Sequence, residues 1–470
     1  MKLTTRTTTT LAFLLFLLDR PHHLLAAAES DKRELSSSSN RQLALFNAFN
    51  VYGQPNPSVS KIDIDQRSIV ASTALSSTVG LKQTKTNYEE GGLGFKTLKA
   101  LIMDDDVYKG YDLYQKAVVF YGGDEYYGDT WMQAAFGGDD VYLGDNLFSM
   151  SRLDLEGRST AIRWGTLVFN VLLGGVMSYM HRAVRTCEAS PSNALQDWDY
   201  AFSYYTGSLA ESDFPVGGYL LYNLVQLYSE VFGTTQKDQE SPINTEILEF
   251  FVDSRNQIAD NQCDELDGLQ RIMGLLVVPL IQGCLKAVYA MDLEDDSRQI
   301  TQGEAAAFSS AMIPILGGLC GSKGNAQIVY NDLSPGNGPS GSFEVVKGAF
   351  EHSYDCLGIT CADVGGIVSY DGTYHKRAEA CKNVQPVKGA GEYPSKGSGN
   401  NSSSSPKTTN SSTEKTNAGL ALGITFGILF TFLIGIGIRC LLVRSKRRSR
   451  QNTLGPEKGL EDKTDDPELI

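Results

Sequence analysis

Tyrosines and carboxylates are concentrated between Asp104 and Asp145, the most unusual stretch of this sequence. The tyrosines there are Tyr108, Tyr111, Tyr114, Tyr121, Tyr126, Tyr127 and Tyr142, and the acidic residues between them are Asp112, Asp124, Glu125, Asp129, Asp139, Asp140 and Asp145. Phenolate and carboxylate are hard oxygen ligands, which a hard trivalent cation such as Fe³⁺ prefers. The stretch therefore indicates a ferric iron site, although core tyrosines and Gly-Asp turns would leave the same pattern.

Ligation by tyrosine would select for a strongly polarising ion. The pKa of a free tyrosine is near 10, so phenolate is rare at neutral pH. A bound cation stabilises the deprotonated ligand and lowers that pKa. Calcium would instead use the carboxylates and backbone carbonyls, so a calcium-binding or purely structural, adhesive role is the alternative.

Other chemistries have little support in the sequence. Beyond the N-terminal region the histidines are His181, His352 and His375, and none lies in a zinc-protease pattern. No nucleophile elbow, phosphate-binding loop or dinucleotide fingerprint is present, so we expect no enzyme activity. The net charge of −14 argues against nucleic acid, whose phosphate backbone requires a positive surface.

The two ends of the chain predict a type I single-pass membrane protein. Lys2 and Arg6 precede the apolar run Leu11–Leu18, and alanines follow at 26–28, which is the order of a signal peptide over residues 1–28. Ala418–Ile438 carries no charge and predicts a transmembrane helix over 418–443. Basic residues follow at once, which places the tail, 444–470, in the cytosol and the rest of the chain outside, at the plasma membrane.

An ectodomain over 30–390 and a stalk over 392–417 lie between these ends. The stalk is rich in Ser, Thr and Asn and contains the glycosylation sequons of Asn400, Asn401 and Asn410. Outside the expected membrane helix there are seven cysteines, an odd number, so at least one is free or pairs between chains. Cys356 and Cys361 are near enough to close a small disulfide loop.

The ectodomain reads as mainly α-helical. Helical periodicity marks Asp63–Met103, Ala161–Thr186, Asn244–Asp260, Asp264–Leu293 and Glu304–Leu319. Two apolar stretches within them, Gly165–Met180 and Gly274–Leu285, are too short or too interrupted to span a membrane and predict buried helices.

A short pattern, A-x-x-[FY]-Y-x-G, occurs twice, at Ala117–Gly123 and Ala201–Gly207. An internally duplicated helical domain would produce this repetition, and so would chance in a chain rich in tyrosine and glycine.

The second copy of the pattern opens a longer segment, Trp198–Thr234, which reads WDYAFSYYTGSLAESDFPVGGYLLYNLVQLYSEVFGT. Its aromatic opening, its Gly-Tyr-Leu-Leu-Tyr and its closing Phe-Gly-Thr resemble the algal low-iron-inducible periplasmic and iron-assimilation proteins, the phytotransferrin-like family. The resemblance is sharp over this segment and diffuse elsewhere. The chain lacks the G-x-H-x-x-E signature of the imelysins, another helical, iron-linked extracellular family.

The resemblance implies a cell-surface protein that binds ferric iron together with carbonate for iron uptake, without catalysis, and with endocytic or reductase partners. It implies Tyr121 and Tyr205 as phenolate ligands, with Asp124 and Asp199 as nearby carboxylates. A ligand set of this kind also includes a histidine, and the candidates are His181 and His352. Arg163, Arg182 and Arg185 are the candidates for holding carbonate, because a guanidinium binds an anion bidentately.

Overall fold

The computed structural model describes residues 57–104, 111–208, 218–236, 240–263, 268–294, 296, 298–335 and 343–383. These residues belong to one compact unit. The predicted signal peptide, stalk, transmembrane helix and tail lie outside the described residues, as do Asn400, Asn401 and Asn410, so those assignments stay predictions.

The described residues are mostly helical, which confirms the predicted α class. The first half contains α4 (Pro57–Ser60), α5 (Ile62–Thr73), α6 (Thr78–Glu90), α7 (Leu98–Leu101), α9 (Asp112–Phe120), α10 (Tyr127–Gly137), the antiparallel strands β1 (Asp140–Leu143) and β2 (Asn146–Ser149), η1 (Met150–Arg152), α11 (Leu155–Gly165), the π-helical segment η2 (Thr166–Met177) and α12 (Ser178–Thr186). The second half contains α13 (Pro191–Thr206), α14 (Leu221–Val231), α15 (Pro242–Ala259), α16 (Leu269–Leu293), α17 (Gln299–Pro314), the π-helical segment η4 (Ile315–Leu319), α18 (Lys323–Leu333), α19 (Phe343–Glu351), α20 (Tyr354–Leu357), α21 (Cys361–Val364) and η5 (Cys381–Asn383).

The two apolar stretches lie in core helices. The first belongs to one continuous helix, Leu155–Thr186, and the second to α16. Both helices are long and apolar enough to cross a membrane, but 83% and 89% of their most apolar windows are buried inside the fold. That burial confirms the prediction from the sequence. A helix that is apolar on all sides is covered by neighbouring helices in a folded unit.

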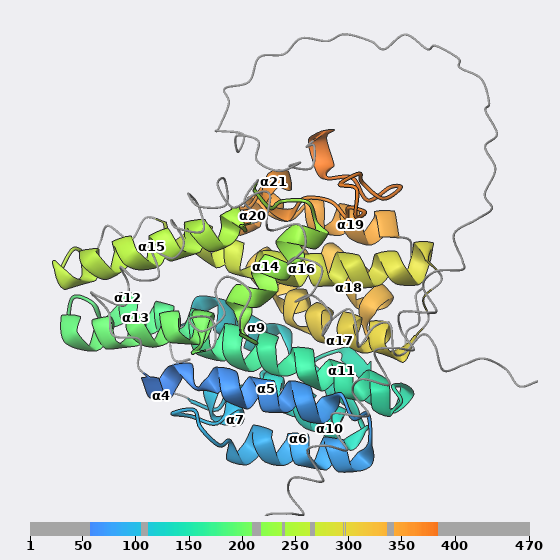
Figure 1. Ribbon diagram of the computed structural model, residues 1–470, viewed down its shortest axis with the longest axis horizontal. Helices are drawn as coiled ribbons and strands as arrows, with labels where there is room; N and C mark the ends of the chain where they lie inside the picture. The colour runs from blue at the N-terminus through green and yellow to red at the C-terminus, as the bar shows by residue number, and fades with distance from the viewer. Residues whose placement is uncertain are drawn as a thin grey trace, which may run out of the picture. The chain divides into compact units, whose positions relative to one another are not determined.

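Helix α11 packs closely against α17, and α12 runs beside α13 (Figure 1). Small residues permit the α11–α17 contact: a Cβ on Gly303 would lie 2.1 Å from the carbonyl oxygen of Gly157. Helix α11 continues into the π-helical segment η2, and α17 continues into the π-helical segment η4. A π-helical turn is rare and is often found at functional sites.

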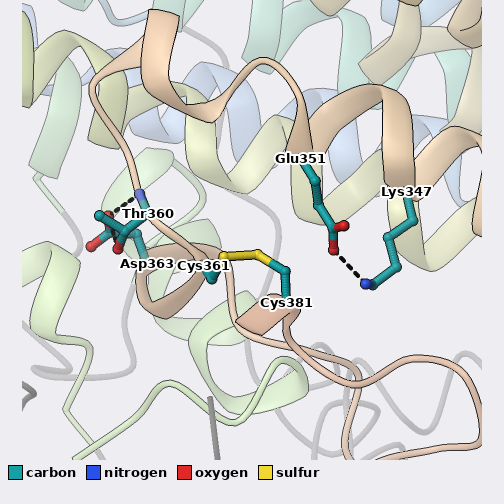
Figure 2. The surroundings of a disulfide bond; sticks show 6 residues. All are labelled: Lys347, Glu351, Thr360, Cys361, Asp363 and Cys381. Carbon is teal, nitrogen blue, oxygen red and sulfur yellow. Dashed lines mark hydrogen bonds and ion pairs between the residues drawn. A yellow bond between two sulfur atoms is a disulfide. The ribbon is translucent and has the colours of Figure 1, made fainter. Parts of the chain in front are cut away.

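The predicted loop between Cys356 and Cys361 is wrong. Both cysteines form disulfides, but Cys356 pairs with Cys320 and Cys361 pairs with Cys381, as Figure 2 shows for the second bond. A third disulfide joins Cys187 to Cys263 and leaves Cys284 buried and free, the odd cysteine that the count required. The loop fails because Thr360, just before Cys361, starts α21 with a capping box and turns the chain away.

Arg271 fastens this C-terminal region to the helices. Its guanidinium donates hydrogen bonds of 2.7 and 2.8 Å to Asp363, on α21, and of 2.8 and 3.0 Å to Glu246, on α15. Asp363 also closes the capping box with Thr360 (Figure 2). One planar fork therefore holds two carboxylates from distant parts of the sequence.

Candidate functional site

The two tyrosines predicted as iron ligands are core residues. Tyr121 ends α9 and donates a hydrogen bond of 2.6 Å to the carbonyl oxygen of Ser310, on α17. Tyr205, on α13, donates to the side-chain oxygen of Asn244, on α15. Burial raises the pKa of both phenols well above the usual value. Each hydroxyl is therefore satisfied as a neutral donor within the packed interior.

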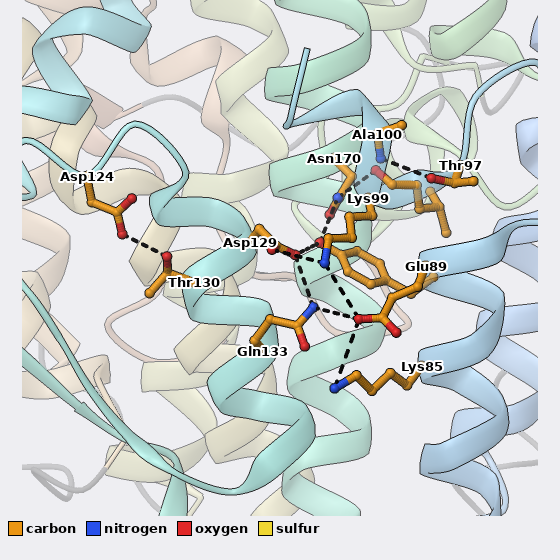
Figure 3. Close-up of polar contacts among 12 residues, drawn as sticks. Lys85, Glu89, Thr97, Lys99, Ala100, Asp124, Asp129, Thr130, Gln133 and Asn170 are labelled. Atoms are coloured by element: carbon orange, nitrogen blue, oxygen red, sulfur yellow. Dashed lines mark hydrogen bonds and ion pairs between the residues drawn. The ribbon is translucent and has the colours of Figure 1, made fainter. Parts of the chain in front are cut away.

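The predicted carboxylates have structural partners. Asp124 accepts hydrogen bonds from the backbone N–H of Tyr126 (2.8 Å) and from the hydroxyl of Thr130 (2.7 Å), which ties down the start of α10 (Figure 3). Asp199 accepts two hydrogen bonds, of 2.7 and 3.2 Å, from the guanidinium of Arg255 on α15. Both carboxylates fix helices, which is their role in this structure.

The remaining predicted residues are scattered. His181 stacks on Tyr111 with ring centroids 5.0 Å apart, and His352 is exposed at the end of α19. Arg185 is exposed in the last turn of α12. Across the described part of the chain, no three His, Cys, Asp or Glu side chains are placed to hold one metal ion. The six predicted iron ligands contact different elements and are not assembled as a set.

Tyrosines do gather elsewhere, where α12 packs against α13. Tyr179 and Arg182 are on α12, and Asp197, Tyr200 and Tyr204 are on α13; we call these five residues the tyrosine–arginine cluster. Their spacings of three, four and seven residues place each set on one face of its helix. Arg182 is the only one of the five that the sequence predicted for the site.

The three tyrosine rings are in contact. The centroid of Tyr179 lies 5.4 Å from that of Tyr204 and 5.7 Å from that of Tyr200. The hydroxyls of Tyr179 and Tyr204 interact, but the Tyr204 hydroxyl meets no partner at full hydrogen-bond geometry among the described residues. A buried hydroxyl left in this way is an unused oxygen ligand.

A guanidinium and a carboxylate lie beside these hydroxyls. Arg182 Nε donates a hydrogen bond of 2.8 Å to Asp197, and Nη2 donates a second one. The guanidinium carbon also lies 4.6 Å from the centre of the Tyr179 ring. Asp197 is buried, while 22% of the Arg182 side chain is exposed, so solvent reaches the cluster from the arginine side.

Both phenols are protonated at neutral pH. Burial raises the pKa of Tyr179 to about 12, although Arg182 pulls it down. Burial and the neighbouring Tyr179 raise the pKa of Tyr204 well above its usual value. Only a strongly polarising cation would displace these protons, so the cluster discriminates against weakly bound ions.

Two neighbouring segments position the cluster. Gly175, in η2, gives room to Tyr204, because a Cβ there would lie 3.0 Å from the Tyr204 ring. The loop before α7 covers the other side: Phe95 packs on Tyr200 with centroids 5.9 Å apart, and the Lys96 ammonium lies 5.7 Å from the Tyr179 ring. Lys96 also forms an ion pair with Asp104.

The first copy of the repeated pattern packs on a similar segment but carries different side chains. Helix α9 lies against η4, as α13 lies against η2, and both π-helical segments contain Leu-Gly-Gly. Phe120, which the pattern aligns with Tyr204, packs on Gly317, where a Cβ would lie 2.2 Å from its ring. Leu113 stands where α13 has Asp197. The [FY] position of the pattern was thus the signal in the sequence that could have identified Tyr204.

A second group of tyrosine and carboxylates, shown in Figure 3, is a closed ion-pair network. Lys99 Nζ lies 3.4 Å from Asp129 Oδ2 and 3.6 Å from Glu89 Oε1. Tyr88 donates a hydrogen bond of 2.8 Å to Asp129, and Gln133 bonds both carboxylates. Because a lysine ammonium already lies between the two carboxylates, this network has no need of a metal ion.

Comparison of the chain with protein-family models, with curated proteins and with solved structures found no match. Its function must therefore be argued from the residues and their arrangement.

Proposed function

We propose that this protein captures ferric iron outside the cell and that the tyrosine–arginine cluster is the place where it binds. The supporting observation is the pair of buried hydroxyls of Tyr179 and Tyr204, which face each other beside a carboxylate held by Arg182. Tyr204 also lies in the segment that resembles the phytotransferrin-like family. Among the described residues no other pair of buried tyrosine hydroxyls has this combination of contacts.

The charges of the cluster suit a ferric ion with carbonate. Tyr179 and Tyr204 as phenolates, together with Asp197, would match the three positive charges of the ion. Arg182, within the cluster, and Lys96, beside it, would match the two negative charges of carbonate. Lys96 would share its charge with Asp104.

Binding would exchange the partners of Arg182. In the described structure its guanidinium is bonded to Asp197. When Asp197 turns to the ion, the guanidinium is left with two parallel donors, which is the arrangement that holds a planar oxyanion. Arg182 would thus bind the Asp197 carboxylate in the iron-free protein and carbonate in the iron-bound protein.

Iron binding would release protons, because both phenols carry one at neutral pH. Acid therefore opposes binding twice: it reprotonates the phenolates and it converts carbonate to carbonic acid. A protein of this kind would take up iron at the cell surface and release it in an acidic compartment. The predicted signal peptide, glycosylated stalk and membrane helix supply the anchor, and endocytic or reductase partners would complete uptake.

We also propose that the helical unit arose by internal duplication. The supporting observation is that both copies of the repeated pattern pack on a Leu-Gly-Gly segment of π-helix. The duplication would have left one polar and one apolar copy, and so a single iron site per chain.

The test is the visible absorption spectrum of the purified full-length protein, titrated with chelated ferric iron with and without bicarbonate. Tyrosinate bound to ferric iron gives a charge-transfer band that carboxylate binding does not. We expect one equivalent of iron to produce the band, only with bicarbonate, and Tyr179→Phe to remove it. The matched control is Tyr121→Phe, which should leave the band unchanged.

Other outcomes would decide between the alternatives. A band without bicarbonate would remove carbonate from the proposal but keep the iron. No band, with a melting temperature raised by calcium and unaffected by iron, would overturn the proposal in favour of a calcium-binding or adhesive ectodomain.

A further inference from the structure

Arg163 is a half-buried cation to whose guanidinium the described residues give no bonding partner. It lies in the last turn of α11, and its side chain is only partly accessible. Among the described residues, its guanidinium forms no hydrogen bond and no ion pair; its close contact is with the face of Trp164, 4.8 Å away. Charges removed from water in folded proteins are almost always paired, so an anion bound at this guanidinium would stabilise the arrangement.

The groups around Arg163 are identified by a chain of contacts. Trp164 packs on Phe308 with centroids 5.3 Å apart, and Phe308 packs on Tyr228 at 6.0 Å. The Tyr228 hydroxyl donates a hydrogen bond of 2.8 Å to Glu304, on α17. Arg163 therefore lies near one carboxylate, that of Glu304, and its charge also acts on Tyr228.

Glu304 cannot serve as the partner of Arg163, because it is already engaged. Lys286, on α16, donates hydrogen bonds of 2.8 and 3.0 Å to its two oxygens, and Tyr228 donates a third. The charges are thus two cations, Arg163 and Lys286, against one carboxylate. Burial lowers the pKa of Arg163 despite the opposing pull of Glu304, as expected of a cation that lacks compensation.

We propose that Arg163 binds a small planar oxyanion, with the two parallel N–H donors of its guanidinium directed at two oxygens of the ligand. A carboxylate of a small organic acid and bicarbonate share this chemistry. The site is separate from the tyrosine–arginine cluster, and the inference does not depend on iron binding. Trp164 reports on it, because an anion on the guanidinium changes the charge over the indole ring.

The experiment measures the melting temperature and tryptophan fluorescence of the iron-free, full-length protein in sodium chloride, sodium acetate and sodium bicarbonate at equal ionic strength. We expect acetate or bicarbonate, but not chloride, to raise the melting temperature by about 2 °C at roughly tenfold excess over the Kd. A response to acetate alone, to bicarbonate alone or to both supports the site and identifies the source of the oxyanion.

Two variants make the result specific. In Arg163→Met the oxyanion response should vanish, and the melting temperature in chloride should equal or exceed that of the wild type, because an uncompensated charge has been removed. Arg163→Lys, which keeps the charge and loses the fork, should respond at least tenfold more weakly. The proposal is overturned if Arg163→Met melts lower in chloride and the wild type is indifferent to all three salts. Should Arg163→Met not fold, the wild-type salt series and Arg163→Lys decide the question alone.

Discussion

Helices α9 and α13 carry the same short pattern and pack on the same kind of segment, yet their surroundings differ. Phe120 of α9 and Tyr204 of α13 both place an aromatic ring on a glycine of a π-helical segment. Phe120 contacts Gly317 and the ring of Tyr121, whereas around Tyr204 there are two more tyrosines and an arginine–aspartate pair. The ring is therefore what the packing requires, and the hydroxyl of Tyr204 is an addition that packing does not explain.

The largest effect should come from making α13 resemble α9. We expect Tyr204→Phe to fold, because Phe120 fills the equivalent place, and to weaken ferric iron binding at least about 100-fold, more than is usual for loss of an outer partner of a metal. Absorption in the visible range measures it. The matched control is Tyr205→Phe, which should cost about 1 kcal/mol of stability, because Asn244 Oδ1 loses its donor, and should keep the iron band. Equal loss in both variants would mean that α13 is merely misfolded.

Replacing the glycine under each aromatic ring by alanine should destabilise the protein by different amounts at the two copies of the pattern. Gly175→Ala meets the root of the buried Tyr204 ring at 3.0 Å, so this side chain and its helix must shift together, and should destabilise the protein by about 2–3 kcal/mol. Gly317→Ala meets only the far edge of the partly exposed Phe120 ring, which can turn aside, and should cost under about 1 kcal/mol. Chemical denaturation would measure both. The reverse order would show that Tyr204 is held less tightly than Phe120.

The buried hydroxyl of Tyr179, in the tyrosine–arginine cluster, should make the free energy of unfolding fall as the pH rises through the alkaline range. Because the pKa of Tyr179 is raised to about 12 in the folded protein, its contribution is complete below pH 10 and is lost as the pH rises to about 12. The loss should be on the order of 2 kcal/mol, since one pKa unit corresponds to about 1.4 kcal/mol. Denaturation at pH 9, 10.5 and 12 would show it, and Tyr179→Phe should flatten this part of the profile. An unchanged slope in that variant would assign it to other tyrosines.

A small effect on stability, with none on iron binding, is expected beside α9. Asp124→Ala removes the acceptor of the hydrogen bonds from Tyr126 and Thr130 at the start of α10 and should cost about 1 kcal/mol, the usual contribution of a hydrogen bond. It should leave iron binding unchanged. Weaker iron binding in this variant would return Asp124 to the ligand set that the sequence suggested and would contradict the difference between the two copies.

The choice between Tyr204 and Tyr205 illustrates how far the sequence led. The pattern predicted Tyr205, and the proposed site uses Tyr204 in the same helical turn, but adjacent helical positions point about 100° apart. Tyr204 faces α12 and contacts Tyr179, whereas Tyr205 faces α15 and bonds Asn244. A difference of one residue therefore separates the tyrosine that the sequence predicted from the one used in the proposed site. His181 and Arg182 differ in the same way: the first stacks on Tyr111 and the second joins the cluster.

The disulfides illustrate the same limit at a larger scale. The odd number of cysteines required one without a partner, and Cys284 is that residue. Their pairing could not be read from spacing, because Cys361 starts a capped helix and meets Cys381 instead of its neighbour Cys356. Sequence distance sets only which loops are short, not which cysteines the fold brings together.

The sequence by itself determined the helical class, the burial of the two apolar helices and the existence of an unpaired cysteine, because hydrophobic periodicity and counting are local properties of the chain. Only the tertiary structure decided that Tyr179, Tyr204 and Arg182 meet on one helical hairpin, while the guanidinium of Arg163 finds no bonding partner in the part of the chain that the structure describes. Periodicity states which face of a helix is buried, but not which other helix covers that face. That choice depends on how all the helices pack at once.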